Sequence, residues 1–227
     1  MIGLSRNKVS TQTICVQISE RGKQASISGQ ILQQATMDLV NDSNFSTHVN
    51  ELLNDWHVPG VAIAVVQDGQ VASKGYGSAC LERQTQMTAD SLFDIASSSK
   101  SLTAASIALL VADNDNYPQV QWDTPVSKLL PDDFVMSEND YTENVTVEDI
   151  LSHRSGFPRH DYSYLSVRAE HPDSARSVTR NLRNLQNAAP FRSKYMYCNV
   201  MYTVATYLVE ELSGLPFADF LKRHFFG

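Results

Sequence analysis

The spacing of hydrophobic residues changes twice in the first half of the chain. Between residues 45 and 56 the apolar side chains recur at helical spacing, as Phe45, Val49, Leu52, Leu53 and Trp56. A continuous apolar run then follows from Val61 to Val66, and Asp68-Gly69 separates it from a second short run over 70–76. A two-residue Asp-Gly connection is typical of a tight hairpin turn. The pattern therefore predicts a helix followed by an antiparallel β-hairpin.

Beyond the hairpin the chain carries helical patterns, and from about 120 to 213 it shows no clear alternating strand. An apolar helix is predicted over 98–112, with hydrophobic residues on most sides, which is typical of a central helix. The sequence Thr-Val-Glu-Asp at 146–149 has the form of a capping box. Another apolar helix is predicted over 200–212, closed by Gly214, and a last one begins at 216.

These elements predict an α+β fold in which an antiparallel sheet packs with helices beside an all-helical subdomain. We expect residues 1–44 to be a poorly ordered leader or tail and residues 45–227 to form the folded domain. The helical subdomain is expected at about 115–213. Three arginines at helical spacing, Arg176, Arg180 and Arg183, predict a solvated helix face.

Composition removes several functional classes. The chain has 227 residues, 42% of them hydrophobic, and a formal net charge of -7 with a pI near 5.3. No cluster of Lys and Arg indicates a nucleic-acid surface. No apolar run approaches the roughly 18 residues that a membrane span needs, and the N-terminus lacks the apolar segment of a signal peptide, so the expected location is cytoplasmic.

Cysteine and histidine patterns predict neither a disulfide framework nor a metal centre. The three cysteines are far apart and form no CxxC pair: Cys15, Cys80 and Cys198. Three of the histidines have no ligand spacing between them: His57, His160 and His171. We therefore expect no metal and no cofactor.

The candidate nucleophile lies in Ser97-Ser-Ser-Lys100, an S-x-x-K sequence. At a helix start, residues three apart share one face, so the Lys100 amine can approach the Ser97 hydroxyl and act as its base. The helix N-terminus adds backbone N–H groups near a developing oxyanion. About one such tetrapeptide is expected by chance, and a second one does occur at Ser5–Lys8. A serine-rich helix cap is the alternative reading.

A second constellation, Tyr197-Cys-Asn199, directly precedes the apolar helix at 200. Residues two apart in an extended stretch point the same way, so a phenol and an amide can face one site. The alternative is a structural helix start, with Asn199 as its cap and Tyr197 in the core. His153 is interpreted as a turn residue, because no G-x-S-x-G sequence supports a Ser-His-Asp triad.

The order of several blocks resembles the beta-lactamase-related serine hydrolases, which include class C beta-lactamases, D-alanyl-D-alanine carboxypeptidases and related esterases and transesterases. The resemblance runs from about 45 to 227, and its blocks lie at 58–66, 93–104, 122–131, 146–158 and 197–214. It implies a beta-lactamase/transpeptidase-like fold. The Y-x-N sequence, in place of S-D-N, points to the class C and esterase side.

The resemblance also implies roles for individual residues. Ser97 matches the acylated nucleophile, Lys100 the residue that helps to deprotonate it, and Tyr197 the proton relay to the leaving group. Asn199 matches an Asn that positions the lysine and the substrate. The implied partner is a small-molecule acyl substrate; the substrate itself and the oligomeric state stay open, as does the choice between hydrolysis and acyl transfer.

One part of the family pattern is missing from the sequence. The family carries a third motif, Lys-Thr-Gly or His-x-Gly, on a later strand, and nothing after Asn199 fits it. We therefore expect an N-terminal portion of the family domain. The first hypothesis is an enzyme that acts through acyl-Ser97 on an ester, amide or beta-lactam. The alternative is a truncated or non-catalytic relative that binds a partner or has no function.

Overall fold

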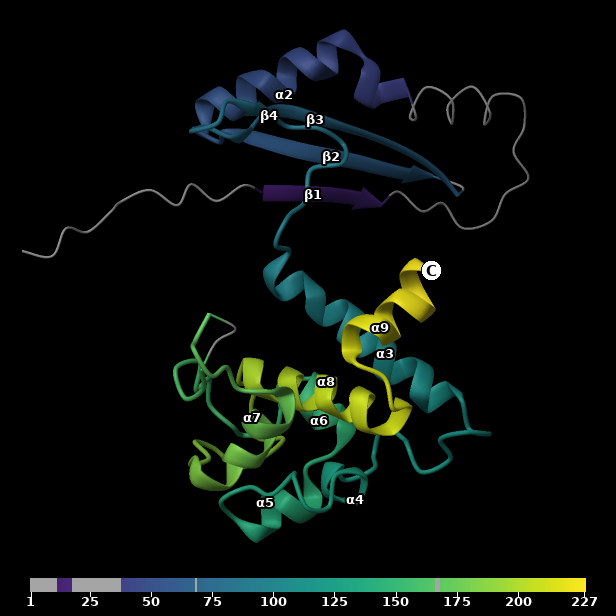
Figure 1. The fold of residues 1–227 in the computed structure, drawn as a ribbon, viewed down its shortest axis with the longest axis vertical. Coiled ribbons are helices and arrows are strands. Elements are labelled where there is room, and N and C mark those ends of the chain that lie inside the picture. Colours follow the sequence, from purple (N-terminus) through teal and green to yellow (C-terminus); the bar gives the residue numbers. More distant parts are fainter. Residues whose placement is uncertain (1–11, 18–37, 68, 166–167) are drawn as a thin grey trace, which may run out of the picture. The chain divides into compact units, whose positions relative to one another are not determined.

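The computed structural model describes residues 12–17, 38–67, 69–165 and 168–227, and it divides into two compact units at Ile95. The first unit holds a sheet and a helix, and the second is helical (Figure 1). The candidate residues Ser97, Lys100, Tyr197 and Asn199 all belong to the second unit.

The sheet of the first unit has four strands in the order β1-β2-β3-β4. The predicted hairpin forms β2, Gly60–Gln67, and β3, Gln70–Cys80, which pair antiparallel with Val61 opposite Tyr76. Asp68 of the predicted turn lies outside the described residues. Two strands extend the hairpin: β1, Gln12–Gln17, runs parallel to β2, and the short β4, Thr85–Gln86, pairs with β3. Only the hairpin was expected from the sequence.

The predicted N-terminal helix is α2, Ser43–Asp55, and it covers one face of this sheet (Figure 1). It begins where the Asp42 carboxylate accepts the backbone N–H of Phe45 at 2.8 Å, which satisfies one of the free N–H groups at a helix start. Val49 of the helix packs against Val61 and Tyr76 in a small apolar core. A short 3-10 turn, η1 (Leu39–Asn41), precedes α2, and the Tyr76 hydroxyl donates to the Val40 carbonyl.

The second unit contains the remaining helices. They are η2 (Ala96–Ser99), α3 (Lys100–Ala112), α4 (Val126–Leu129), α5 (Asn139–Asn144), α6 (Val147–Leu151), α7 (Ala175–Asn181), η3 (Leu182–Asn184), α8 (Asn199–Ser213), α9 (Phe217–Leu221) and a π-helical turn at Lys222–Phe226. The predicted helical range of 115–213 lies inside this unit. Among the described residues, no helix is long and apolar enough to cross a bilayer.

The centre of the helical unit is α8, against which α3, α6, α7 and α9 pack (Figure 1). Its side chains Met201, Val204 and Leu208 are fully buried. Gly214 ends the helix in the left-handed region at φ 67°, which a residue without a side chain adopts readily. The sequence predicted that the helix at 98–112 is also central, and α3 packs against α8. Within the helical unit α3 buries Ile107 and Leu110 but leaves Leu109 41% exposed.

The three arginines predicted as a solvated face are exposed, and two of them also pair with a buried carboxylate. Arg176 Nε lies 2.9 Å and Arg180 Nη1 3.2 Å from the carboxylate of the buried Asp133. The Tyr207 hydroxyl of α8 donates to the same carboxylate. The spacing of the arginines was read correctly, but their partner comes from a loop more than 40 residues earlier, which local periodicity does not reveal.

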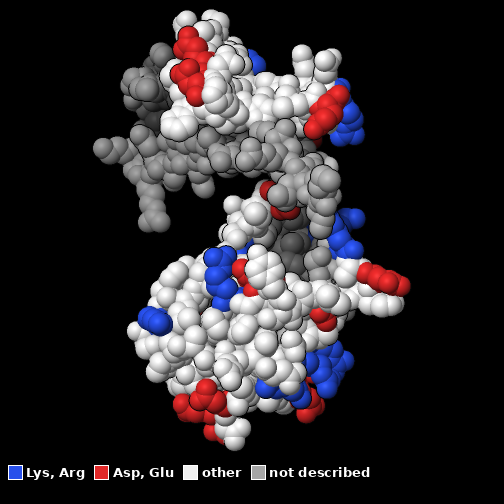
Figure 2. Space-filling model, turned by 90° about the vertical axis from the view of Figure 1, so that its left-hand side faces the viewer, with Lys and Arg blue, Asp and Glu red and all other residues white. Residues whose placement is uncertain are grey.

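Charges of both signs are spread over the helical unit. Figure 2 shows Lys and Arg side chains interspersed with Asp and Glu over the face that it presents. Some of these charged side chains form ion pairs, such as Arg176–Asp133 and Arg192–Asp149.

We predict that Asp133→Asn destabilises the protein by about 1–3 kcal/mol at neutral pH, because it weakens hydrogen bonds to charged groups. Burial alone raises the pKa of Asp133, but the Tyr207 hydroxyl and the two arginines outweigh it and leave the pKa lowered. The contribution of a carboxylate with a lowered folded-state pKa is present above its unfolded pKa and is lost as the pH falls through the folded value. Denaturant unfolding of both proteins at pH 7 and below pH 4 should therefore show the difference shrinking in acid. An equal difference at both pH values would contradict this role.

Candidate active site

The helical unit brings the two sequence motifs into direct contact. Ser97 Oγ and Tyr197 Oη share a hydrogen bond of 2.6 Å, although the residues are 100 positions apart. Lys100 Nζ donates to Ser97 Oγ at 3.0 Å and to Asn199 Oδ1 at 2.7 Å. All four residues predicted from the sequence thus form one hydrogen-bonded cluster.

Ser97 and Lys100 are placed by the start of α3. Ser97 lies in the 3-10 turn η2, and Lys100 is the first residue of the α-helix. Ala96, just before the serine, has a positive φ of 45°, an uncommon conformation for a residue with a side chain. Ser97 is exposed and Lys100 is half-buried, so the hydroxyl faces solvent while the amine lies beneath it.

Tyr197 and Asn199 are placed by a segment that runs along the turn after α6. The backbone N–H groups of Ala188 and Arg192 donate to the Gly156 and Arg154 carbonyls, and the N–H of Met196 donates to the His153 carbonyl. Gly156 has a φ of 76°, and a Cβ there would lie 2.1 Å from the Ala189 carbonyl oxygen. Only glycine allows this close approach, which brings the following residues to the site.

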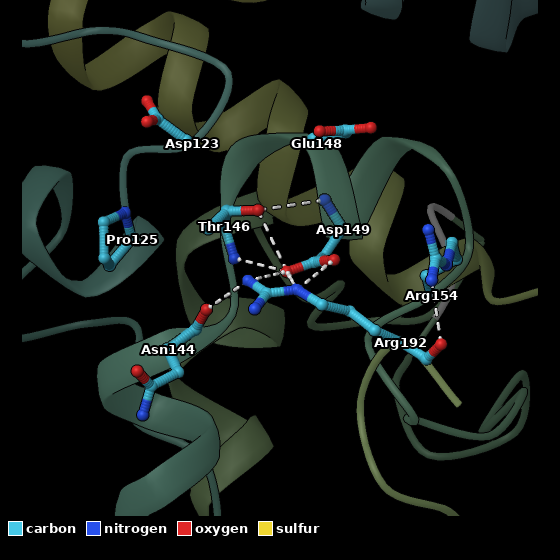
Figure 3. A pocket seen from close by; sticks show the side chains of 8 residues that line it. All are labelled: Asp123, Pro125, Asn144, Thr146, Glu148, Asp149, Arg154 and Arg192. Atoms are coloured by element: carbon cyan, nitrogen blue, oxygen red, sulfur yellow. Dashed lines mark hydrogen bonds and ion pairs between the residues drawn. The ribbon is translucent and has the colours of Figure 1, made fainter. Parts of the chain in front are cut away.

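An ion pair between the buried Asp149 and the partly exposed Arg192 holds the same segment at the N-terminus of α6. The Asp149 carboxylate accepts the backbone N–H and hydroxyl of Thr146, which completes the predicted capping box, and it also binds Arg192 at 2.7 Å (Figure 3). Arg192 donates in addition to the Asn144 carbonyl at 2.9 Å. Its backbone therefore has a fixed place five residues before Tyr197, even though its φ of 63° is unfavourable.

A hollow of about 420 Å³ lies beside this ion pair. Figure 3 shows its lining, which comprises Asp123, Pro125, Asn144, Thr146, Glu148, Asp149, Arg154 and Arg192. None of the four candidate residues lines it. A second hollow, of about 530 Å³, is lined by Arg159, His160, Asp161, Tyr162 and Ser163 and so adjoins the cluster through Asp161.

His153 packs against the segment that carries Tyr197 and Asn199. It is 7% exposed, and its Nδ1 accepts the backbone N–H of Cys198 at 3.1 Å. Its ring lies 4.5 Å from the Tyr197 ring and 5.2 Å from the Tyr202 ring, measured between centroids. The sequence interpretation as a turn residue agrees with this position, and its φ of 59° is that of a turn.

The cluster carries two cations and one carboxylate around the phenol. The Lys100 ammonium beside it lowers the pKa of the Tyr197 hydroxyl, and the Ser97 bond and the Arg159 charge act in the same direction. Arg159 lies 5.5 Å from the centroid of the Tyr197 ring and pairs with Asp161 at 3.1 Å. Asp161 in turn accepts the Asn199 amide N–H at 2.9 Å.

Sequence reasoning missed both Arg159 and Asp161. They follow the Gly-Phe-Pro turn at 156–158, in a stretch without periodicity or a recognised spacing. Their location directly after Gly-Phe-Pro was the only available signal. Cys198 lies between the two motif residues but is fully buried, and burial raises the pKa of its thiol to about 11, which keeps it protonated at neutral pH. In the described part of the chain, no three His, Cys, Asp or Glu side chains gather as metal ligands would.

Comparison with known proteins identifies the family of the chain. Residues 45–227 match the family model described as Beta-lactamase, and the chain therefore belongs to the beta-lactamase family. This confirms the resemblance noted in the sequence.

Two fungal relatives are similar in sequence. The chain is 47% identical over 182 residues to "Unguisins hydrolase ungD'" of Aspergillus campestris, which covers 80% of this chain and 34% of the relative. It is 44% identical over 183 residues to "Unguisins hydrolase ungD" of Aspergillus violaceofuscus, covering 81% and 32%. The chain thus spans about a third of the length of these relatives.

Solved structures confirm the fold class. The D-amino acid amidase of Ochrobactrum anthropi SV3 superposes with a TM-score of 0.63 at 24% identity, covering 87% of this chain and 50% of the amidase. An octameric penicillin-binding protein homologue from Pyrococcus abyssi gives a TM-score of 0.61 at 23% identity, covering 79% and 41%. The fold is therefore of the beta-lactamase/transpeptidase type.

We predict that His153→Phe keeps the ring contacts but destabilises the protein by about 1–3 kcal/mol, because the buried Cys198 N–H loses its acceptor. Burial and, second, the Lys100 charge lower the pKa of His153. The stability that the neutral ring provides is therefore present above the unfolded pKa of about 6.5 and is lost as the pH falls through the lowered folded value. Thermal unfolding of both proteins between pH 5 and 8 checks this. A variant whose stability falls in acid as steeply as that of the parent protein would refute the assignment.

Proposed function

We propose that this protein is a serine hydrolase or acyltransferase that acts through an acyl-Ser97 intermediate on an ester, amide or beta-lactam. The observation that carries the proposal is the contact of Lys100 Nζ and Tyr197 Oη with one exposed hydroxyl, at 3.0 Å and 2.6 Å. A serine hydroxyl becomes a nucleophile when a positioned base takes its proton, and here both neighbours are within proton-transfer distance.

In the first step Ser97 Oγ attacks the carbonyl carbon of the substrate. Lys100 or Tyr197, in its deprotonated amine or phenolate form, accepts the Oγ–H proton, and the carbonyl π electrons move onto the oxygen, which becomes the oxyanion. The positive end of the adjoining helix α3 favours that negative charge. Collapse of the oxyanion then breaks the bond to the leaving group and leaves an ester between the acyl group and Ser97.

Tyr197 supplies the proton that the leaving group needs. Its hydroxyl has Ser97 and Lys100 as neighbours. Its lowered pKa lies closer to neutral pH, where a general acid–base group works best. In the second step water, or another alcohol or amine, attacks the ester, and the same groups carry the proton back to Ser97. Hydrolysis and acyl transfer differ only in this second nucleophile.

Asn199 orients the base. Its carbonyl oxygen holds Lys100 Nζ at 2.7 Å, which keeps the amine pointing at Ser97. The names of the relatives support hydrolysis: two are unguisins hydrolases, and one at 28% identity is the N-acetylmuramyl-L-alanine amidase of Bacillus subtilis. A D-amino acid amidase shares the fold. Amide bonds are therefore the first substrates to assay.

We predict that Ser97→Ala abolishes covalent labelling by a fluorescent fluorophosphonate or penicillin. Ser98→Ala is the matched control, because it removes the adjacent hydroxyl of the same 3-10 turn. Gel fluorescence after timed incubation measures both rates. Labelling of the Ser97→Ala protein at the parental rate would show that another residue reacts with the probe and would contradict Ser97 as the nucleophile.

We predict that Lys100→Arg and Tyr197→Phe each slow labelling by about 10²- to 10⁴-fold, the usual effect of removing a general acid or base. Arginine keeps the positive charge but does not give up its proton, so the lysine variant separates base catalysis from charge. Circular dichroism should show an unchanged helical signal. Near-parental labelling by Lys100→Arg would show that Lys100 acts through its charge alone.

A further inference from the structure

The Asn199 amide has one orientation that satisfies both of its neighbours. Its carbonyl oxygen accepts from Lys100 Nζ at 2.7 Å, and its NH₂ donates to Asp161 Oδ1 at 2.9 Å. Rotating the amide by half a turn would place the NH₂ against an ammonium group and the carbonyl oxygen against a carboxylate. Both contacts would be repulsive, because an ammonium is only a donor and an ionised carboxylate only an acceptor.

Asp161 is itself held in place. Its other oxygen, Oδ2, accepts from Arg159 Nε at 3.1 Å, and its side chain is 27% exposed. Bonds between ionised and hydrogen-bonding groups are stronger than neutral ones, so each carboxylate oxygen has a defined direction. The Arg159 guanidinium also lies 5.5 Å from the Tyr197 ring centroid, which closes the chain of contacts at the phenol.

These contacts form a ring that returns to the nucleophile. In order around it are Ser97, Lys100, Asn199, Asp161, Arg159 and Tyr197. We propose that Asp161 is a positioning residue for this site: it fixes the Asn199 amide so that the carbonyl oxygen keeps Lys100 beside Ser97. This inference rests on the proposed function of Ser97 and Lys100.

Asp161 acts through Asn199, whose amide N–H donates to its carboxylate. Without the carboxylate, the amide is free to turn, and Lys100 loses its second acceptor. Small misplacements of catalytic groups cost up to about 10²-fold in rate. If the effect passes through Asn199, then removing both side chains should cost no more than removing Asn199 alone.

The first test is a double-mutant cycle on the rate of fluorophosphonate labelling. Asp161→Ala should lower the rate about 10- to 100-fold. Asp161→Asn should recover most of that loss, because its amide oxygen still accepts from Asn199. The double variant Asp161→Ala/Asn199→Ala should label at the rate of Asn199→Ala. Effects of the two substitutions that multiply, or an Asp161→Asn variant as slow as Asp161→Ala, would overturn the proposal.

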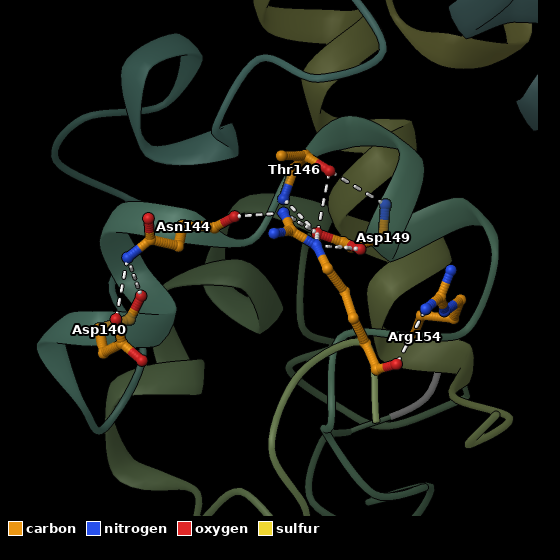
Figure 4. Close-up of polar contacts among 6 residues, drawn as sticks. Asp140, Asn144, Thr146, Asp149 and Arg154 are labelled. Carbon is orange, nitrogen blue, oxygen red and sulfur yellow. Dashed lines mark hydrogen bonds and ion pairs between the residues drawn. The ribbon is translucent and has the colours of Figure 1, made fainter. Parts of the chain in front are cut away.

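Asp140→Ala is the matched control. Asp140 Oδ1 accepts from the Asn144 amide at 2.9 Å, the same pair of groups at the same distance, but both residues belong to α5 and neither is one of the six residues of the ring around Ser97 (Figure 4). We expect it to label at the parental rate. A loss as large as that of Asp161→Ala would show that the effect does not depend on contact with Asn199.

The second test does not depend on acylation. Tyrosine ionisation is followed by absorbance, and the Tyr197 signal is obtained by subtracting the matching Tyr197→Phe protein. The charged and titratable groups facing this phenol are Lys100, Arg159, His153 and Tyr202. Asp161→Ala and Asp161→Asn remove the same charge but differ in the acceptor.

Tyr197 should therefore titrate at higher pH in Asp161→Ala than in Asp161→Asn, because only the first releases Lys100 from its place. Identical titrations would overturn the positioning role. The titration needs no covalent adduct, so it tests the role of Asp161 independently of acylation. Whether Ser97 is the nucleophile is decided separately by the Ser97→Ala labelling.

Discussion

The buried carboxylate of Asp149 is the anchor on which the geometry of the site depends. It caps α6 through Thr146 and binds Arg192, whose backbone leads into the Tyr197–Asn199 segment. Removing Arg192 would leave the buried Asp149 carboxylate with its bonds to Thr146 but without its cation, which is destabilising. The ion pair and the close approach at Gly156 thus bring Tyr197 to a serine 100 residues earlier in the chain.

The groups around Ser97 are joined by a few short hydrogen bonds. The Lys100 ammonium donates to the Ser97 hydroxyl and to the Asn199 amide oxygen. The Tyr197 phenol forms a short hydrogen bond with the same hydroxyl. In such a network each bond fixes the direction of the next, so the orientation of one amide affects the nucleophile. The neutral His153 ring beneath Tyr197 completes the support without adding charge.

The sequence predicted the parts of this arrangement that are local. Helical spacing predicted α2 and α8, and an apolar run with an Asp-Gly turn predicted the hairpin. The capping box predicted at Thr146–Asp149 is present. The order of the blocks led to the family. The pairing of Asp133 with Arg176 and of Asp161 with Asn199 could not be predicted, because each joins residues 38 or more positions apart through side chains with no periodic signal.

The most direct test of the account is a rapid-quench experiment with an activated ester or amide substrate. Trypsin cleaves after Arg83 and Lys100 and releases the peptide 84–100, which holds Ser97 together with Ser91, Ser98 and Ser99. Fragmentation by mass spectrometry then locates any added acyl mass. The account predicts an acyl group on Ser97 that appears before product release and decays with turnover. Turnover with no acyl mass on this peptide, or with the acyl group on another serine, would contradict it.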